Sequence, residues 1–110
     1  MSEPAWREFN IEGLARTVEG REPRFNEFLR TATLSGAVYL LPAGAEDIQA
    51  PHLEDEVYLV VSGRARLRIA GQERDVMAGH IFYVRATTEH TFFRIDEDLK
   101  LVASSEHHTL

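Results

Sequence analysis

Hydrophobic and polar residues alternate along much of the chain after residue 25. The clearest case is the segment 64–69, RARLRI, in which arginines alternate with Ala65, Leu67 and Ile69. A period of two places successive side chains on opposite faces of a β-strand. We therefore predict a strand here with one packed face and one solvated, arginine-bearing face.

Other short apolar segments, interrupted by Gly, Pro and Asp, predict further strands. Residues 70–72 have the composition of a tight hairpin, and a second turn is expected at 78–79. The strand formed by 56–63 is expected to end near Ser62 and Gly63, where the strand 64–69 begins. The pattern predicts eight or nine strands, typical of an all-β sandwich or barrel. The remaining segments lie at 25–34, 36–44, 73–77, 80–84, 90–95 and 99–104.

The N-terminal part of the chain has a different period. Within 10–18, apolar residues recur at helical spacing behind Asn10, a good helix N-cap, and Gly20 is expected to end the helix. We predict an N-terminal segment with a short helix (1–24), one β-barrel domain (25–104) and a polar C-terminal tail (105–110).

The segment 57–61, VYLVV, is apolar on both faces of its predicted strand. A strand that is hydrophobic on both sides is covered on both sides. The interior of the barrel covers one face. The other needs a lid, which is either the N-terminal segment with Trp6 and Phe9 or a second copy of the protein, and we favour a homodimer.

Composition narrows the choice of compartment and partner. The 110 residues suffice for one domain with a real core, and the 44% hydrophobic and 27% charged residues are those of an ordinary globular protein. Cysteine is absent, which excludes disulfides and thiolate metal ligands and fits a reducing cytoplasm. A net charge of −6 argues against nucleic-acid binding. We find neither a secretory signal nor a run of membrane-spanning length, so we expect a cytoplasmic protein.

Three consecutive acids, Glu54, Asp55 and Glu56, directly precede the apolar segment 57–61, and His52 lies two residues before them. Clustered carboxylates repel one another and resist desolvation, so beside a core they need a cation, a hydrogen-bond network or open water. A divalent metal bound by a histidine and a glutamate would meet this need.

The same stretch resembles the first motif of the cupin family. That motif reads glycine, five residues, histidine, one residue, histidine, three or four residues, glutamate, six residues, glycine. Gly44, His52, Glu56 and Gly63 match it, with His52 as the second histidine, and Ala50 stands in place of the first.

The second cupin motif reads glycine, five residues, proline, one residue, glycine, two residues, histidine, three residues, asparagine. Gly79 and His90 have the required separation. Arg85, Thr87 and Arg94 replace the expected proline, glycine and asparagine. The ligand position of this motif is therefore kept and its turn residues are lost.

The resemblance implies a double-stranded β-helix, or jelly-roll barrel, with a metal at its mouth. It implies that His52, Glu56 and His90 bind a divalent transition metal. Two imidazoles and a carboxylate with open positions suit Fe, Mn, Ni or Zn. A small organic molecule is expected in the barrel, and the resemblance implies dioxygenase, lyase or isomerase chemistry if the protein is an enzyme.

Two other classes of function remain open. One is a non-catalytic module that binds a sugar or organic acid and uses the imidazoles as hydrogen-bond partners without metal. The other is a structural β domain without a pocket. One fold of this kind serves many unrelated activities, so the sequence leaves the reaction and the substrate open.

Several further residues are weighed as secondary candidates. Glu54 is either a replacement ligand or a solvated acid at the rim, and Glu54 or a tyrosine is expected to handle protons. Asp55 is expected to point outward. Arg85 and Arg94 are candidates for holding an anionic substrate near the mouth.

Aromatic residues and the remaining histidines have less specific roles. The aromatic residues either line the cavity or form plain core. We read the other histidines as residues outside the metal site. The aromatic candidates are Tyr39, Tyr58, Tyr83, Phe82 and Phe92, and the histidines set aside are His80, His107 and His108.

Overall fold

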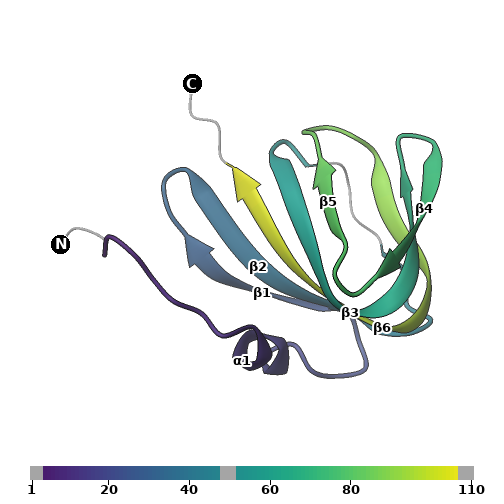
Figure 1. The fold of residues 1–110 in the computed structure, drawn as a ribbon, viewed down its shortest axis with the longest axis horizontal. Coiled ribbons are helices and arrows are strands. Elements are labelled where there is room, and N and C mark those ends of the chain that lie inside the picture. Colours follow the sequence, from purple (N-terminus) through teal and green to yellow (C-terminus); the bar gives the residue numbers. More distant parts are fainter. Residues whose placement is uncertain (1–3, 48–51, 107–110) are drawn as a thin grey trace.

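The computed structural model describes residues 4–47 and 52–106. In this part of the chain one short helix precedes six strands, which form a single antiparallel sheet in the order β1-β2-β6-β3-β4, with β5 paired to β3. Figure 1 shows the sheet curled into an open barrel, with α1 against its outside. The elements are α1 (Ile11–Arg16), β1 (Arg24–Arg30), β2 (Leu34–Leu41), β3 (Asp55–Ile69), β4 (Gln72–Met77), β5 (Ile81–Val84) and β6 (His90–Glu106).

The N-terminal helix begins where the sequence predicts. The side chain of Asn10 accepts a hydrogen bond of 2.9 Å from the backbone N–H of Gly13, which satisfies one of the free donors of the first turn. The helix is shorter than the predicted range 10–18, because it ends at Arg16 with Thr17 as its C-cap.

The prediction of eight or nine strands is wrong for the described residues. Segments 56–63 and 64–69 are one strand, β3, and segments 90–95 and 99–104 are one strand, β6. The expected break near Gly63 is instead a series of register shifts against β6, and Gly63 has a φ of +104°. Bulges of this kind bend a strand without ending it. β3 and β6 can therefore take part in both walls of the barrel.

The hairpin predicted at 70–72 joins β3 to β4. Ala70 and Gly71 have φ angles of +49° and +78°. Two adjacent residues with positive φ are the signature of the tight turn that matches the twist of paired strands.

Hydrophobic residues pack on both faces of the sheet. The main cluster fills the barrel and includes Tyr58, Leu67, Phe92, Leu99 and Leu101. A smaller cluster lies on the outside, where Leu14 and Val18 of the N-terminal segment cover Val38 and Leu40 of β2. The N-terminal segment thus covers β2. The lid expected from the sequence was for the strand 57–61, where Val57 stays 42% exposed, and Trp6 is itself 75% exposed.

The C-terminal end of the barrel is longer than expected. β6 continues to Glu106, so Ser105 and Glu106 belong to the sheet and not to a polar tail. His107 and His108 lie outside the described residues. Within the described ranges, the structure contains no helix with the length and apolar character needed to cross a bilayer.

Candidate metal centre

Glu56 is a buried carboxylate at the start of β3. It pairs with Val84 of β5 and Ser105 of β6, and its exposed fraction is 3%. Its side chain points to the same face as those of Tyr58 and Val60, because alternate residues of a strand share a face. A buried carboxylate is costly unless charge or hydrogen bonds compensate it.

His52 lies four residues before Glu56, and its imidazole is the nearest cation-forming group. Nε2 of His52 is 3.2 Å from Oε1 of Glu56. The backbone carbonyl of His52 accepts a hydrogen bond of 2.7 Å from the N–H of Thr87, which joins this residue to the connection between β5 and β6. Oε1 of Glu56 is buried, and no hydrogen-bond donor in the described part of the chain meets it with good geometry. This oxygen is therefore available to a ligand.

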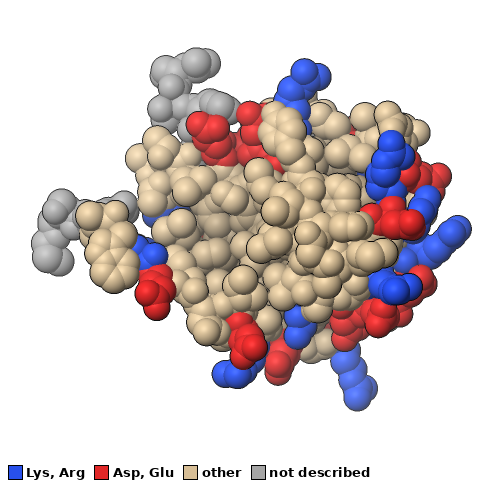
Figure 2. Space-filling view, viewed as in Figure 1, with Lys and Arg blue, Asp and Glu red and all other residues tan. Residues whose placement is uncertain are grey.

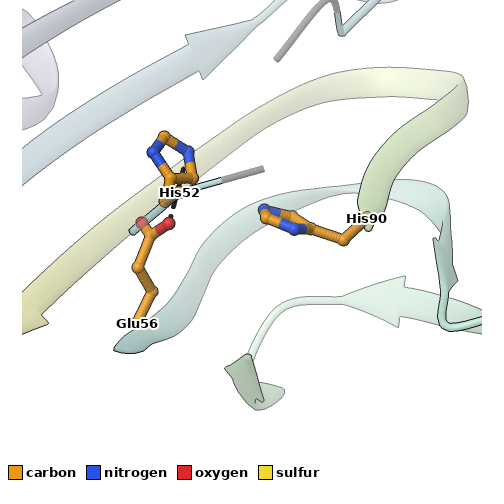
Figure 3. A group of neighbouring side chains, drawn as sticks. All are labelled: His52, Glu56 and His90. Carbon is orange, nitrogen blue, oxygen red and sulfur yellow. Dashed lines mark ion pairs between the residues drawn. The ribbon is translucent and has the colours of Figure 1, made fainter. Parts of the chain in front are cut away.

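His90 reaches the same place from the other long strand. It is the first residue of β6 and lies opposite Ile69, at the far end of β3 from Glu56. The curl of the sheet brings the two ends of β3 close together. β5 ends beside Glu56, and residues 85–89 lead directly from β5 to His90. Figure 3 shows the ring of His90 approaching His52 and Glu56 from a separate strand.

Two hydrogen bonds fix the orientation of the His90 ring. Its Nδ1 is 2.9 Å from the backbone carbonyl of Thr88, and its Nε2 is 3.0 Å from the hydroxyl of Tyr58. A carbonyl only accepts, so Nδ1 carries the proton and donates it to Thr88. In the neutral ring Nε2 then presents a lone pair, to which Tyr58 donates. This is the tautomer that a metal-binding histidine needs.

The three side chains offer donor atoms that all lie within 4.8 Å of one another. Donors bound at about 2.1 Å to neighbouring positions of one ion are about 3.0–3.4 Å apart, so closing on an ion requires the side chains to approach one another by up to about 1.8 Å. Oε1 of Glu56 and the lone pair on Nε2 of His90 are suited to bind such an ion. Two nitrogens and one oxygen are a ligand set found with Fe(II), Mn, Ni and Zn. Position 50, where the sequence has alanine, lies outside the described residues.

Two tyrosines inside the barrel are kept neutral. Burial raises the pKa of Tyr58 far above its usual range, and the negative charge of Glu56 raises it further. Burial and then Glu56 also raise the pKa of Tyr39. From the sequence, Tyr58 is expected either to line the cavity or to form plain core. Its place two positions after Glu56 on one strand was the signal that puts its hydroxyl at the site.

Two aspartates position the segments around the site. Oδ2 of Asp47 accepts a hydrogen bond of 2.9 Å from the N–H of Phe92, and the carbonyl of Asp47 accepts one from the hydroxyl of Thr91. Asp47 therefore holds the start of β6, a role that no motif in the sequence indicates. Asp55, which we expected to point outward, is half-buried and accepts a hydrogen bond of 2.8 Å from the N–H of Ala86.

Other secondary candidates lie away from the three donors. Glu54 is not a member of the donor group found among the described residues, and its charge acts on Arg30. Arg94 lines a surface cleft of about 330 Å³ together with Arg64 and Arg66, and none of the three donors lines that cleft. Tyr83 is 60% exposed on the outer face of the sheet, where it lines a surface pocket of about 400 Å³ with Val57 and Ser104.

The arginine stripe on β3 is a solvated face, as the alternation predicts. Ala65 and Leu67 are buried between the arginines. Arg64 and Arg66 form ion pairs with Glu97 and Asp75, and the guanidinium of Arg68 lies over the ring of Phe93. His80, set aside by the sequence analysis, contacts the ring of Phe82 and lies outside the donor group.

The chain belongs to the cupin domain family, whose model matches residues 37–104. It is 37% identical over 94 residues to SCO3923, an uncharacterized protein of Streptomyces coelicolor, and the match covers 86% of this chain and 90% of that protein. The resemblance to the cupin family that the two motifs indicate is therefore confirmed.

Solved structures show the same fold at low sequence identity. The DMSP lyase DddQ of Ruegeria pomeroyi has a TM-score of 0.72 and 16% identity, over 77% of this chain and 47% of the lyase chain. A salicylate 1,2-dioxygenase variant of Pseudoaminobacter salicylatoxidans has a TM-score of 0.71 and 16% identity, over 76% of this chain and 26% of that chain. This chain thus spans less than half the length of either enzyme. The predicted all-β jelly-roll barrel with a short N-terminal helix is confirmed.

Proposed function

We propose that this protein binds one divalent transition metal through His52, Glu56 and His90 and acts on, or senses, a small organic molecule in the barrel. The observation that carries the proposal is Oε1 of Glu56, a buried carboxylate oxygen without a hydrogen bond from the described residues, beside two imidazoles. A divalent ion would compensate such a carboxylate, whose nearest printed partner among the described residues is the imidazole of His52, 3.2 Å from the same oxygen.

When bound, the metal supplies a Lewis acid that polarises an oxygen of the substrate. His52, Glu56 and His90 would hold the ion through three donor atoms and would leave further positions to substrate or water. Fe, Mn, Ni and Zn all fit this set of donors. The related structures include a lyase and a dioxygenase, both of which act on small molecules according to their names.

Tyr58 is the proton-carrying group nearest to the donors. Its hydroxyl is 3.0 Å from Nε2 of His90 and holds its proton because burial raises the pKa of the phenol. If Nε2 of His90 held an ion, the Tyr58 O–H would lose this acceptor and would be able to donate to a bound substrate. A neutral, buried phenol at this place favours lyase or isomerase chemistry, in which a proton is moved, over reaction with oxygen.

A non-catalytic binding module is the second candidate. The hydrogen bond from Tyr58 to Nε2 satisfies His90 without metal, and alanine at position 50 supplies no ligand atom. A chain of this kind would keep the barrel for a sugar or acid and use His52 and His90 as hydrogen-bond partners. We place either form in the cytoplasm, in keeping with the absence of cysteine.

Elemental analysis of protein purified without chelators tests the metal. We expect about one transition metal per chain in the wild type, and loss of that metal in His52→Ala, Glu56→Gln and His90→Ala. His80→Ala is the matched control, because His80 is a histidine outside the donor group. Equal metal content in all of these variants would contradict the proposal. Metal-free wild-type protein that binds small acids would favour the binding module.

Tyr58→Phe separates binding from proton transfer. We expect this variant to retain the metal, because the phenyl ring keeps the packing against Phe92. We expect it to lose turnover of a substrate that requires proton transfer. Oxygen uptake with catechols or diketones that is unchanged by Tyr58→Phe would instead identify a dioxygenase.

A further inference from the structure

Phe25 is an exposed aromatic residue on the inner side of the sheet. Its neighbours in β1, Arg24 and Asn26, point outward, because their side chains hydrogen-bond to Glu19 and Thr17 of the N-terminal segment. Successive residues of a strand point to opposite faces, so Phe25 points toward the barrel. Its exposed fraction is nevertheless 63%. A ligand that covered this ring would remove a large apolar area from water.

Other exposed apolar residues of the sheet lie on its outer face. Val57, Ile81 and Tyr83 alternate with buried residues such as Tyr58, so they point away from the barrel interior. In Figure 2 the middle of the visible surface, over β2, β6, β3 and β5 of Figure 1, is free of Lys, Arg, Asp and Glu, which gather at its margins. A ligand of the barrel interior would therefore meet Phe25 and not these outer residues.

Phe25 and Tyr39 together form an aromatic wall. They lie opposite each other on β1 and β2, with ring centroids 5.6 Å apart and ring planes inclined by 23°. Tyr39 also packs against the main hydrophobic cluster inside the barrel. Its hydroxyl finds no hydrogen-bond partner among residues 4–47 and 52–106. The aromatic wall therefore offers a flat apolar surface and one available hydroxyl.

A cavity of about 290 Å³ lies against the aromatic wall. Pro23 and Leu41 extend its apolar lining, and Glu46 and Asp47 contribute acids. Arg24 also lines the cavity, but its guanidinium donates a hydrogen bond to the N-terminal segment. Pockets for drug-sized ligands begin near about 300 Å³, so this cavity suits a molecule of about one ring. The acids disfavour a ligand that carries negative charge at this end.

The aromatic wall is on the same face of the sheet as the proposed metal donors. Through β6, Tyr39 is in register with Val60 of β3, which lies four residues after Glu56. Tyr39 is close enough to Glu56 for the carboxylate to raise the pKa of its phenol. Asp47 lines the cavity and also holds the start of β6, where His90 lies. One small molecule can therefore meet both places.

We propose that the aromatic wall and its cavity bind a neutral, planar ring of the substrate, with an oxygen on that ring hydrogen-bonded to the hydroxyl of Tyr39. This substrate class rests on the proposed function, because the reacting end of the molecule would lie toward His52, Glu56 and His90. A flat ring stacks on Phe25 over its whole face, whereas a puckered ring contacts it through fewer atoms. A sugar needs several hydrogen bonds, and among the described lining residues Tyr39 has the one uncharged side chain that donates.

Titration of the metal-free protein with catechol, followed by two-dimensional NMR, tests the proposal. We expect saturable shifts at Phe25 and Tyr39. The dissociation constant should be at least about fivefold lower than that of trans-1,2-cyclohexanediol, which carries the same two oxygens on a puckered ring. Phe25→Leu keeps the apolar bulk and removes the flat ring, so it should raise the dissociation constant of catechol at least about fivefold. Phe9→Leu is the matched control, because Phe9 is 40% exposed and contacts Phe28 outside the cavity.

Tyr39→Phe tests the hydroxyl and also serves if Phe25→Leu fails to fold. It removes a single oxygen and should raise the dissociation constant of catechol at least about twofold. Equal affinity for the two diols, the absence of saturable shifts, or catechol binding that neither variant weakens would each overturn the proposal.

The outcome is separable from that of the metal proposal, because the titration uses metal-free protein. Catechol binding that depends on Phe25 would support the aromatic wall even if elemental analysis found no metal in the wild type. One metal per chain together with catechol binding indifferent to Phe25 and Tyr39 would overturn the aromatic wall and leave the metal centre standing.

Discussion

At the scale of single residues, two positions of the second cupin motif keep the left-handed backbone conformation although the glycine and asparagine of the motif are replaced there. Thr87 stands where the motif has glycine, and its φ is +65°. Arg94 stands where the motif has asparagine, and its φ is +47°. Glycine and asparagine are the residues that tolerate the left-handed region best. The barrel therefore imposes this conformation on side chains that do not favour it.

Thr87→Gly should consequently stabilise the protein. A β-branched residue in the left-handed region is strained by about 1–2 kcal/mol, and glycine removes the strain at some entropic cost. We expect a gain of about 0.5–1 kcal/mol in the free energy of unfolding, measured by urea denaturation. Thr88→Gly, at a neighbour without positive φ, should lose stability. A loss in Thr87→Gly equal to that in Thr88→Gly would contradict this explanation.

The sequence predicts the three donors of the site but not the groups around them. Motif spacing selects His52, Glu56 and His90, because ligand positions in a barrel are set by strand register. The roles of Tyr58 and Asp47 depend on where a hydroxyl and a carboxylate meet another strand, at His90 and Phe92. Those contacts arise from the curl of the sheet, which local pattern does not specify.

At the scale of elements, the long strands β3 and β6 explain why the predicted strand count was too high. The sequence signals of a turn near Gly63 and near 96–98 are real, but each marks a bend within one strand. Hydrophobic period and turn composition do not distinguish a bulge from a loop, since glycine serves both. The start of α1 behind Asn10 and the hairpin at 70–72 were predicted correctly, whereas α1 ends earlier than predicted.

Gly63→Ala should therefore be severely destabilising. A Cβ at this position would lie too close to the backbone carbonyl of Asp98, and φ is +104°. We expect a loss of about 3 kcal/mol or more in the free energy of unfolding, from left-handed strain and a backbone clash together.

Gly71→Ala provides the comparison for this loss. Its φ is +78°, but a Cβ there meets nothing within 4 Å, so only the left-handed strain of about 1–2 kcal/mol applies. Urea denaturation of both variants measures the difference. Equal losses would show that the bend of β3 does not depend on close approach to β6.

At the scale of the whole molecule, the candidate centre ties together parts that are distant along the chain. His52 precedes β3, Glu56 lies at the start of β3, and His90 begins β6, which pairs with the far end of β3. An ion bound to all three would hold the barrel mouth closed and favour the folded state, because the unfolded chain cannot present the same set. The proposed metal binding is therefore expected to be linked to folding.

Metal-stripped protein should melt at a lower temperature than the same protein with Mn²⁺, an ion that single imidazoles bind weakly. At a free Mn²⁺ concentration one hundred times the dissociation constant, linkage adds about 2.7 kcal/mol. For a domain of this size that corresponds to a rise of about 10 °C in Tm, measured by scanning calorimetry.

His80→Ala should show the same rise as the wild type, because His80 is outside the donor group, while Glu56→Gln should show almost none. Glutamine keeps the shape of the side chain and removes only its charge, so the comparison isolates the attraction between carboxylate and ion from packing. A rise of equal size in Glu56→Gln and the wild type would mean that Mn²⁺ stabilises the fold elsewhere. The buried oxygen of Glu56 would then need a different partner.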